Sequence, residues 1–379
     1  MRIVLFASSF LPVVGGMEYV VHYLAEALFD HGIDVSVVAR RQKDSDNFNH
    51  RYRLLRYGLP FQGGHRSRID HISAYWTLAE LFQKYGIDIA HIHGVSSAPQ
   101  LSLRFFKKKG VPVVMTPHGE DVQRVPEIGY GLRLQKAWDR IIRQHLRTAD
   151  AVTAISNSIR AELSDVSPER IFDVPNGIHT KLFGRGSDMY LHQSLGLDPN
   201  VKIILSVGRN HIKKGYSYGI MAVAELVHKY GIRGWQYVLV GKGVSELRGL
   251  VEQLEISDNV SLIELLPPDK LSRCYKSSEI FFSPSIVEGL SLVSIEAMAS
   301  GLPLVVTDVP GNEDIVREND CGVIVRAKDI SDMSKGLQSL ILDPERRHRL
   351  AEVAFLNSRR YDWSEIARQY IRVYENVLR

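Results

Sequence analysis

The apolar positions of this chain alternate between short β-like runs and longer stretches with helical spacing. In the first half, a buried-type run at residues 2–7 is followed by a helical pattern over 18–31, which Gly32 ends. Alternation of this kind is typical of a parallel sheet covered by helices on both faces. The strands expected in this half are residues 2–7, 34–39, 87–93, 111–118, 151–157 and 171–177.

A second series of the same type follows. Residues 181–200 carry glycine, proline and polar side chains without a strand pattern, and we expect the domain boundary there. The pattern therefore predicts an α/β protein of two doubly wound domains, residues 1–182 and 183–362, followed by a helix at 363–379. The strands expected in the second domain are residues 202–209, 235–241, 260–265, 280–285, 302–308 and 322–327.

The strongest chemical signal is the segment from Glu288 to Glu296, which follows a strand and enters a helix expected to start near Leu290. The free N–H groups and positive dipole end of such a helix favour phosphate. Two carboxylates beside it suit hydroxyl groups better than phosphate, such as those of a sugar and a ribose. A capping role for Glu288 and a solvated position for Glu296 are the plain alternatives. The backbone groups expected at the phosphate are those of Gly289, Leu290, Ser291 and Leu292.

Two cations stand on the loop after the first strand of the second domain. Arg209 lies at the strand end, and Lys214 comes five residues later, before a glycine. A guanidinium fork and an ammonium point charge on one loop suit a diphosphate. An ordinary basic loop would have the same composition.

The first domain offers two weaker signals. Gly15 and Gly16 stand between the first strand and its helix, where glycine permits close backbone approach to a ligand. They lack the G-x-G-x-x-G spacing, which disfavours a dinucleotide-dependent dehydrogenase. His118 follows a strand and precedes Glu120 and Asp121, a poor metal-ligand set that we interpret as a substrate contact. We therefore expect no metal.

Length, composition and charge narrow the class further. The 379 residues fit two domains, and two cysteines do not make a disulfide framework, so a reducing, cytoplasmic location is expected. No apolar run is long enough to span a membrane. Residues 1–180 contain 22 lysines and arginines against 18 acidic residues, which favours an anionic membrane surface or acceptor over nucleic acid. For any one basic cluster, a plain solvated face is the alternative. The basic clusters are Arg51, Arg53, Arg56, Arg66 and Arg68, then Arg104, Lys107, Lys108 and Lys109, then Arg133, Lys136, Arg140, Arg143 and Arg147.

The glutamate pair, the V-G-R-(four residues)-K-G loop, the P-N-G at 175–177 and the early glycine pair resemble glycosyltransferase family 4 over nearly the whole chain. The family more often has glycine at Ser291 and aspartate at His179. The resemblance implies a GT-B fold, in which two Rossmann-like domains face each other across a cleft and the last helix, 363–379, returns to the first domain.

The resemblance also implies residue roles. Glu288 would hold the donor sugar and Glu296 the ribose, while Arg209 and Lys214 would neutralise the diphosphate in place of a metal. Gly16 would approach the phosphate, and His118 would contact the transferred sugar.

On this basis we expect a retaining, metal-independent hexosyltransferase that needs no cofactor besides its nucleotide-sugar co-substrate. A UDP-sugar is favoured and a GDP-sugar is the alternative. The acceptor would be a glycan or lipid-linked molecule of bacterial cell-surface polysaccharide or lipopolysaccharide synthesis, at the cytoplasmic face of the inner membrane. A sugar-nucleotide epimerase of the same fold and a non-catalytic nucleotide-sugar-binding module are the rival functions.

Overall fold

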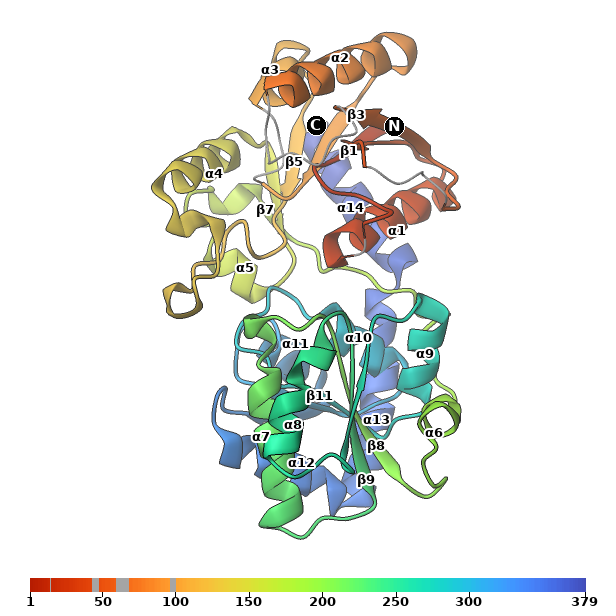
Figure 1. Cartoon of the computed structure of the whole chain (residues 1–379). Coiled ribbons are helices and arrows are strands. Elements are labelled where there is room, and N and C mark those ends of the chain that lie inside the picture. Colours follow the sequence, from red (N-terminus) through yellow and green to blue (C-terminus); the bar gives the residue numbers. More distant parts are fainter. Residues whose placement is uncertain (14, 43–47, 59–67, 96–99) are drawn as a thin grey trace. The chain divides into compact units, whose positions relative to one another are not determined.

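The computed structural model describes residues 1–13, 15–42, 48–58, 68–95 and 100–379. Contacts within the chain group it into two compact units. The first unit is Met1–Gly177 together with Asp362–Arg379, and the second is Ile178–Tyr361. The sequence placed the corresponding boundaries at 182/183 and 362/363. Each unit is an α/β layer structure around a parallel sheet (Figure 1).

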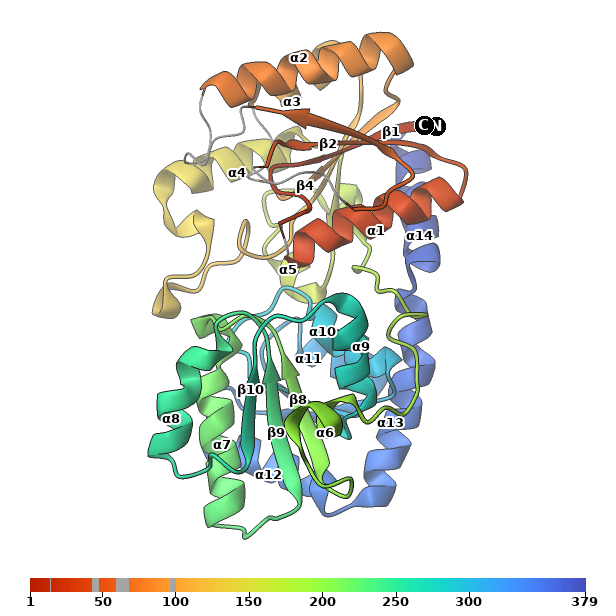
Figure 2. The same ribbon diagram turned by 45° about the vertical axis from the view of Figure 1, so that its right-hand side comes forward.

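The first unit contains seven parallel strands in the order β3-β2-β1-β4-β5-β6-β7. The strand order runs one way from β1 to β3 and the other way from β4 to β7, so right-handed crossovers place α1 on one face of the sheet and α2 and α3 on the other. Figures 1 and 2 show α1 beside the C-terminal helix α14, and α2 beside α3. The strands are β1 Arg2–Ala7, β2 Asp34–Arg40, β3 Arg53–Tyr57, β4 Ile89–His93, β5 Val113–Thr116, β6 Ala151–Ala154 and β7 Ile171–Asp173. The α-helices are α1 Gly16–Asp30, α2 Arg68–Tyr85, α3 Gln100–Lys108, α4 Lys136–Thr148, α5 Asn157–Ala161 and α14 Trp363–Val377. Short 3₁₀ turns are η1 Pro126–Ile128, η2 Leu132–Leu134 and η3 Pro168–Arg170.

Strand β3 was not expected from the sequence. Its residues, RLLRY, pair in parallel with β2, with Ser36 opposite Arg53 and Arg40 opposite Tyr57. The strand lies at the edge of the sheet, where charged side chains are tolerated and guard against pairing with other chains. The arginines read as part of a basic cluster are therefore built into an edge strand.

The second unit contains six parallel strands in the order β10-β9-β8-β11-β12-β13. All six coincide with runs expected from the sequence, because strands buried on both faces are almost continuously apolar. The strands are β8 Lys202–Val207, β9 Trp235–Val240, β10 Val260–Ile263, β11 Ile280–Ser283, β12 Leu304–Thr307 and β13 Gly322–Val325. The helices are α6 Tyr190–Leu195, α7 Tyr216–His228, α8 Arg248–Gln253, α9 Pro268–Lys276, α10 Leu292–Ala299, α11 Glu313–Asn319, α12 Ile330–Ile341 and α13 Pro344–Ser358. The 3₁₀ turns are η4 Ile212–Lys214, η5 Val244–Leu247 and η6 Arg359–Tyr361.

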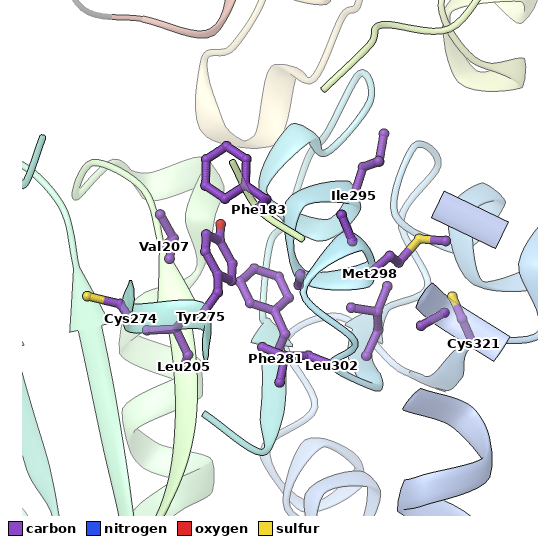
Figure 3. Close-up of a cluster of buried hydrophobic side chains, with 14 of the residues drawn as sticks. Phe183, Leu205, Val207, Cys274, Tyr275, Phe281, Ile295, Met298, Leu302 and Cys321 are labelled. Atoms are coloured by element: carbon purple, nitrogen blue, oxygen red, sulfur yellow. The ribbon is translucent and has the colours of Figure 1, made fainter. Parts of the chain in front are cut away.

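Each face of the second sheet has its own core. On one face, α7, α8 and α12 cover residues such as Ile204 and Leu239. On the other, α10 packs against β11 and β12, and Tyr275 of α9 lies in the same cluster (Figure 3). Burial of this second cluster fixes α10 and α9 against the sheet, and with them the polar residues at their ends. Cys274 and Cys321 are free and buried.

No helix in the described part of the chain combines the length and the apolar character needed to cross a bilayer.

Candidate functional site

The site in the second unit lies where the order of the strands reverses. The chain runs outward from β8 to β10 and then returns to β11 on the other side of β8. The loops that leave β8 and β11 therefore diverge at their carboxyl ends, and ligands of open α/β sheets bind in the crevice that this leaves. Arg209 and Lys214 follow β8, and Glu288 follows β11.

The structure brings Lys214 and Glu288 into direct contact. The Nζ atom of Lys214 lies 2.5 Å from Oε1 of Glu288, and the two side chains are only 14% and 6% exposed. Ser285 donates a hydrogen bond of 2.9 Å to the same carboxylate oxygen. Burial raises the pKa of Glu288, but the charges of Lys214 and Lys213 and these two hydrogen bonds outweigh it and lower the pKa. Glu288 is therefore ionised at neutral pH.

Two glycines let the loops approach this closely. Gly208 has φ +143°, and a Cβ there would lie 2.8 Å from Oη of Tyr216 and 3.2 Å from Cε of Lys214. Gly215 has φ +62°, and a Cβ there would collide with the carbonyl oxygen of Pro284. Both backbone conformations favour glycine, and neither site has room for a side chain.

Arg209 differs from Lys214 in its surroundings. Its side chain is exposed, and it forms no ion pair or hydrogen bond with other residues that the structure describes. An exposed guanidinium without a protein partner keeps all its donors for an anion. The two cations of the loop therefore differ: Glu288 neutralises the charge of Lys214, whereas no described residue neutralises that of Arg209.

Helix α10 begins at Leu292 with Ser291 as its N-cap, two residues later than expected. Ser291 does not cap the helix with its side chain, because its Oγ accepts a hydrogen bond from Oγ of Ser294 at 2.7 Å. Within the described chain, the backbone N–H groups of Leu290, Ser291 and Leu292 donate no hydrogen bond. Gly289 is buried, while Leu290 and Leu292 are half-buried. The helix start therefore retains free donors of the kind that bind phosphate.

Glu296 lies inside α10 and is half-buried. Its Oε2 accepts a hydrogen bond of 2.8 Å from the hydroxyl of Tyr275. Burial raises the pKa of Glu296 to about 7, although the Tyr275 hydrogen bond and the charge of Lys214 oppose the shift. Figure 3 shows Tyr275 in the apolar cluster, with its ring next to those of Phe183 and Phe281. The two glutamates therefore differ in protonation: Glu288 is ionised and Glu296 titrates near neutrality.

The glycine pair of the first unit stands at the start of α1. Gly15 is the N-cap in an extended conformation, and Gly16 is the first helical residue. A side chain at Gly15 would collide with the carboxylate of Glu18. The carboxylate is the far end of a flexible side chain, and the extended backbone of Gly15 is open to any residue, so the local geometry does not require glycine here.

His118 belongs to a buried polar network of the first unit. Its Nε2 lies 3.1 Å from Nδ1 of His93, and burial lowers the pKa of His118 to about 4. The backbone N–H groups of His118 and Gly119 both donate to Oδ1 of Asp121, at 3.0 and 3.1 Å. His118 is therefore a neutral imidazole at pH 7, on a turn held by Asp121. Among the described residues, no group of three or more histidines, cysteines or carboxylates is arranged to hold a metal ion.

Three polar partners of these residues were not singled out in the sequence. Ser285 stands in the S-P-S preceding Glu288, so the polar turn after β11 was a usable signal. Tyr275 comes from α9 and His93 from the end of β4, and nothing local marks either as a partner. Their contacts arise from packing between elements.

Two family models match the chain in sequence. Residues 14–182 match the model described as Glycosyltransferase Family 4, and residues 190–356 match Glycosyl transferases group 1. The chain belongs to glycosyltransferase family 4. This glycosyltransferase is 26% identical to the D-inositol 3-phosphate glycosyltransferase of Acidothermus cellulolyticus, over 96% of the chain and 86% of that protein. It is 25% identical to the same-named protein of Corynebacterium glutamicum, over 96% and 92%.

Solved structures confirm the GT-B fold expected for the enzyme. Sucrose-phosphate synthase from Thermosynechococcus elongatus has a TM-score of 0.79 and 22% identity, covering 99% of this chain and 98% of that one. Anabaena HepE in complex with UDP and glucose has a TM-score of 0.77 and 17% identity, covering 99% and 100%. WaaG, a glycosyltransferase involved in lipopolysaccharide biosynthesis, has a TM-score of 0.74 and 17% identity, covering 97% and 98%.

Proposed function

We propose that this glycosyltransferase moves a hexose from a nucleotide-diphosphate sugar to a hydroxyl group with retention of configuration, and without a metal ion. The observation that carries the proposal is the group of charges after β8 and β11. An unpaired Arg209, a Lys214–Glu288 pair and the free start of α10 lie at the switch point of one sheet. Such a site matches a leaving group that becomes more negative as its bond breaks.

In the proposed mechanism, breaking the anomeric C–O bond builds negative charge on the diphosphate. Arg209, Lys214 and the N–H groups of Ser291 and Leu292 would stabilise that charge, in place of the divalent cation of other transferases. The acceptor hydroxyl would attack from the face that the diphosphate leaves. Its proton would pass to a diphosphate oxygen, so that no protein base is needed.

The glutamates would bind the donor rather than react with it. Glu288, ionised by its contact with Lys214, would accept hydrogen bonds from hydroxyls of the transferred sugar. Glu296 would accept those of the ribose in its deprotonated form. Gly16 and His118 keep the roles that the resemblance implies, and the neutral state of His118 suits a hydrogen bond to a hydroxyl. No cofactor besides the co-substrate is part of the proposal.

We favour a UDP-sugar as donor because HepE, a protein of the same fold, was solved with UDP and glucose. The proposed acceptor is a glycan or lipid-linked molecule of bacterial surface polysaccharide, in line with the involvement of WaaG in lipopolysaccharide biosynthesis. The inositol phosphate glycosyltransferases raise a small phosphorylated polyol as the other acceptor to test.

The test is incubation of the full chain with UDP- and GDP-sugars, with lipid-linked glycans or inositol phosphate as acceptor. Release of nucleotide diphosphate with a glycosylated product of unchanged anomeric configuration, also in the presence of EDTA, supports the proposal. Arg209→Ala should abolish most of this turnover, whereas Arg248→Ala, an exposed arginine of the same unit, should not. Epimerised sugar without transfer, or binding without turnover, would establish one of the rival functions.

A further inference from the structure

Helix α2 carries apolar side chains on its outer face as well as on its inner one. Ala74, Leu78 and Leu81 are buried. On the opposite side Ile69, Ile72 and Trp76 are 55%, 51% and 67% exposed. These three residues are spaced by three and four positions, so they form one stripe. Single exposed apolar residues are ordinary, but an aligned stripe on one helix marks a binding surface.

The neighbouring helix α3 supplies positive charge beside this stripe. Phe105 of α3 packs edge-on against Tyr75 and Phe82 of α2, with ring centroids 5.5 and 5.9 Å apart. This contact fixes which side of α3 adjoins α2. Residues on the outer side of α3 are exposed and form no ion pair with other described residues: Arg104, Lys107 and Lys108.

The other two basic clusters of the first unit are largely neutralised by acids distant in sequence. Arg51 pairs with Glu26 and Asp30, and Arg53 pairs with Asp34. In the third cluster, Arg133, Arg143 and Arg147 share Asp165. Arg66 lies outside the described residues. Among the described residues of the three clusters, the uncompensated charge therefore concentrates on α3 and on Lys136 and Arg140 of α4.

We propose that the α2–α3 face, defined by Ile69, Ile72, Trp76, Arg104, Lys107 and Lys108, binds the surface of an anionic lipid bilayer. Isoleucine and tryptophan side chains enter the boundary between headgroups and acyl chains, and flanking lysines and arginines attract anionic headgroups. A second copy of this chain fits less well, because a two-fold contact through this face would bring the cations of both copies together. The inference rests on the first unit alone and does not depend on the proposed sugar transfer.

The test is sedimentation of the full chain with vesicles of phosphatidylcholine, with and without phosphatidylglycerol. The wild type should bind only the anionic vesicles, and more weakly as salt rises. Two variants, Ile69→Ser/Ile72→Ser/Trp76→Ser and Arg104→Glu/Lys107→Glu/Lys108→Glu, should each lose about tenfold or more in partition coefficient. The matched controls are Leu342→Ser/Leu356→Ser, which are 65% and 55% exposed, and Arg248→Glu/Lys335→Glu/Arg349→Glu. Both controls should stay within about twofold of the wild type, since their residues belong to the second unit and not to the α2–α3 face.

Trp76 gives a second readout that does not depend on the folding of a multiple variant. Lipids brominated along their acyl chains should quench the tryptophan fluorescence of bound wild type, and Trp76→Phe should remove that quenching. Equal vesicle binding by the wild type and both α2–α3 variants would overturn the proposal. So would a wild type that ignores vesicles but self-associates through the stripe in sedimentation velocity. Hydrolysis of a UDP-sugar without vesicles should be unchanged in these variants. This measurement distinguishes a failure of the proposed membrane binding from a failure of the proposed sugar transfer.

Discussion

Replacing Lys214 with methionine should destabilise the second unit before any ligand is considered. The substitution keeps the length of the side chain but removes the charge 2.5 Å from Oε1 of Glu288. Glu288 is only 6% exposed and would keep the Ser285 hydrogen bond as its partner. Breaking a buried ion pair from one side costs about 3–5 kcal/mol, since an uncompensated charge stays behind. Because Lys214 is 14% exposed, we expect a value near the low end, about 3 kcal/mol.

A double-mutant cycle separates this structural effect from a catalytic one. Glu288→Gln combined with Lys214→Met removes both charges, so most of the lost free energy of unfolding should return. Activity should not return, because the diphosphate would still lack its ammonium. Lys229→Met is the matched control, as its Nζ lies equally close to Glu225 but is 58% exposed, and it should cost less than about 1 kcal/mol.

The assay is urea unfolding of the full chain followed by circular dichroism, with nucleotide-sugar turnover measured on the same samples. A loss below about 1 kcal/mol in Lys214→Met, with no recovery in the double variant, would refute the role given to the pair. Recovery of turnover in the double variant would instead refute the role of Lys214 at the diphosphate.

Three further outcomes are expected. Arg209→Ala should lower kcat/KM more than tenfold, about the effect of removing one charge-stabilising donor. Its melting temperature should stay unchanged, because Arg209 is exposed and has no partner among the described residues. A large drop in melting temperature would contradict this. Burial raises the pKa of Glu296 from 4.5 to about 7, so the folded state holds this proton more tightly than the unfolded state does. As pH rises from 4.5 to about 7, the free energy of unfolding of the wild type should therefore fall relative to that of Glu296→Gln. Parallel pH profiles of the two proteins would contradict the raised pKa. Gly177→Ala should destabilise the first unit, since a Cβ there would lie 2.5 Å from the ring of Trp363, and thermal unfolding against Gly249→Ala, where a Cβ meets nothing within 4 Å, checks it.

The sequence predicted the layer structure well because strands buried on both faces form continuous apolar runs, which can be recognised without knowing the fold. Strands such as β8 and β12 are apolar throughout, and their pattern needs no knowledge of the fold. Edge strand β3 was not predicted because it contains two arginines. Both are half-buried at the edge of the sheet, where charged side chains are tolerated. The start of α10 shifted by two residues because Ser291, the N-cap, bonds Ser294 instead of the helix backbone.

The candidate site was predicted as a set of residue types, whereas their pairing was not. Glu288, Arg209 and Lys214 stood out by position relative to strand ends. Nothing in the sequence indicated that Lys214 contacts Glu288, which is 74 residues away, or that Tyr275 reaches Glu296. The basic first half was similarly misleading, because Asp165 neutralises arginines that lie 18–32 residues before it.

The sequence by itself thus determined most of the elements, the family and the residues that we propose to bind a nucleotide sugar. These depend on local periodicity and on motif spacing along the chain. The tertiary structure decided which cation is neutralised, which glutamate titrates near pH 7 and which basic helix remains uncompensated. Those properties depend on strand order and packing, since β11 returns beside β8 and α9 lies against α10, and electrostatic energies change with distances of a few ångströms.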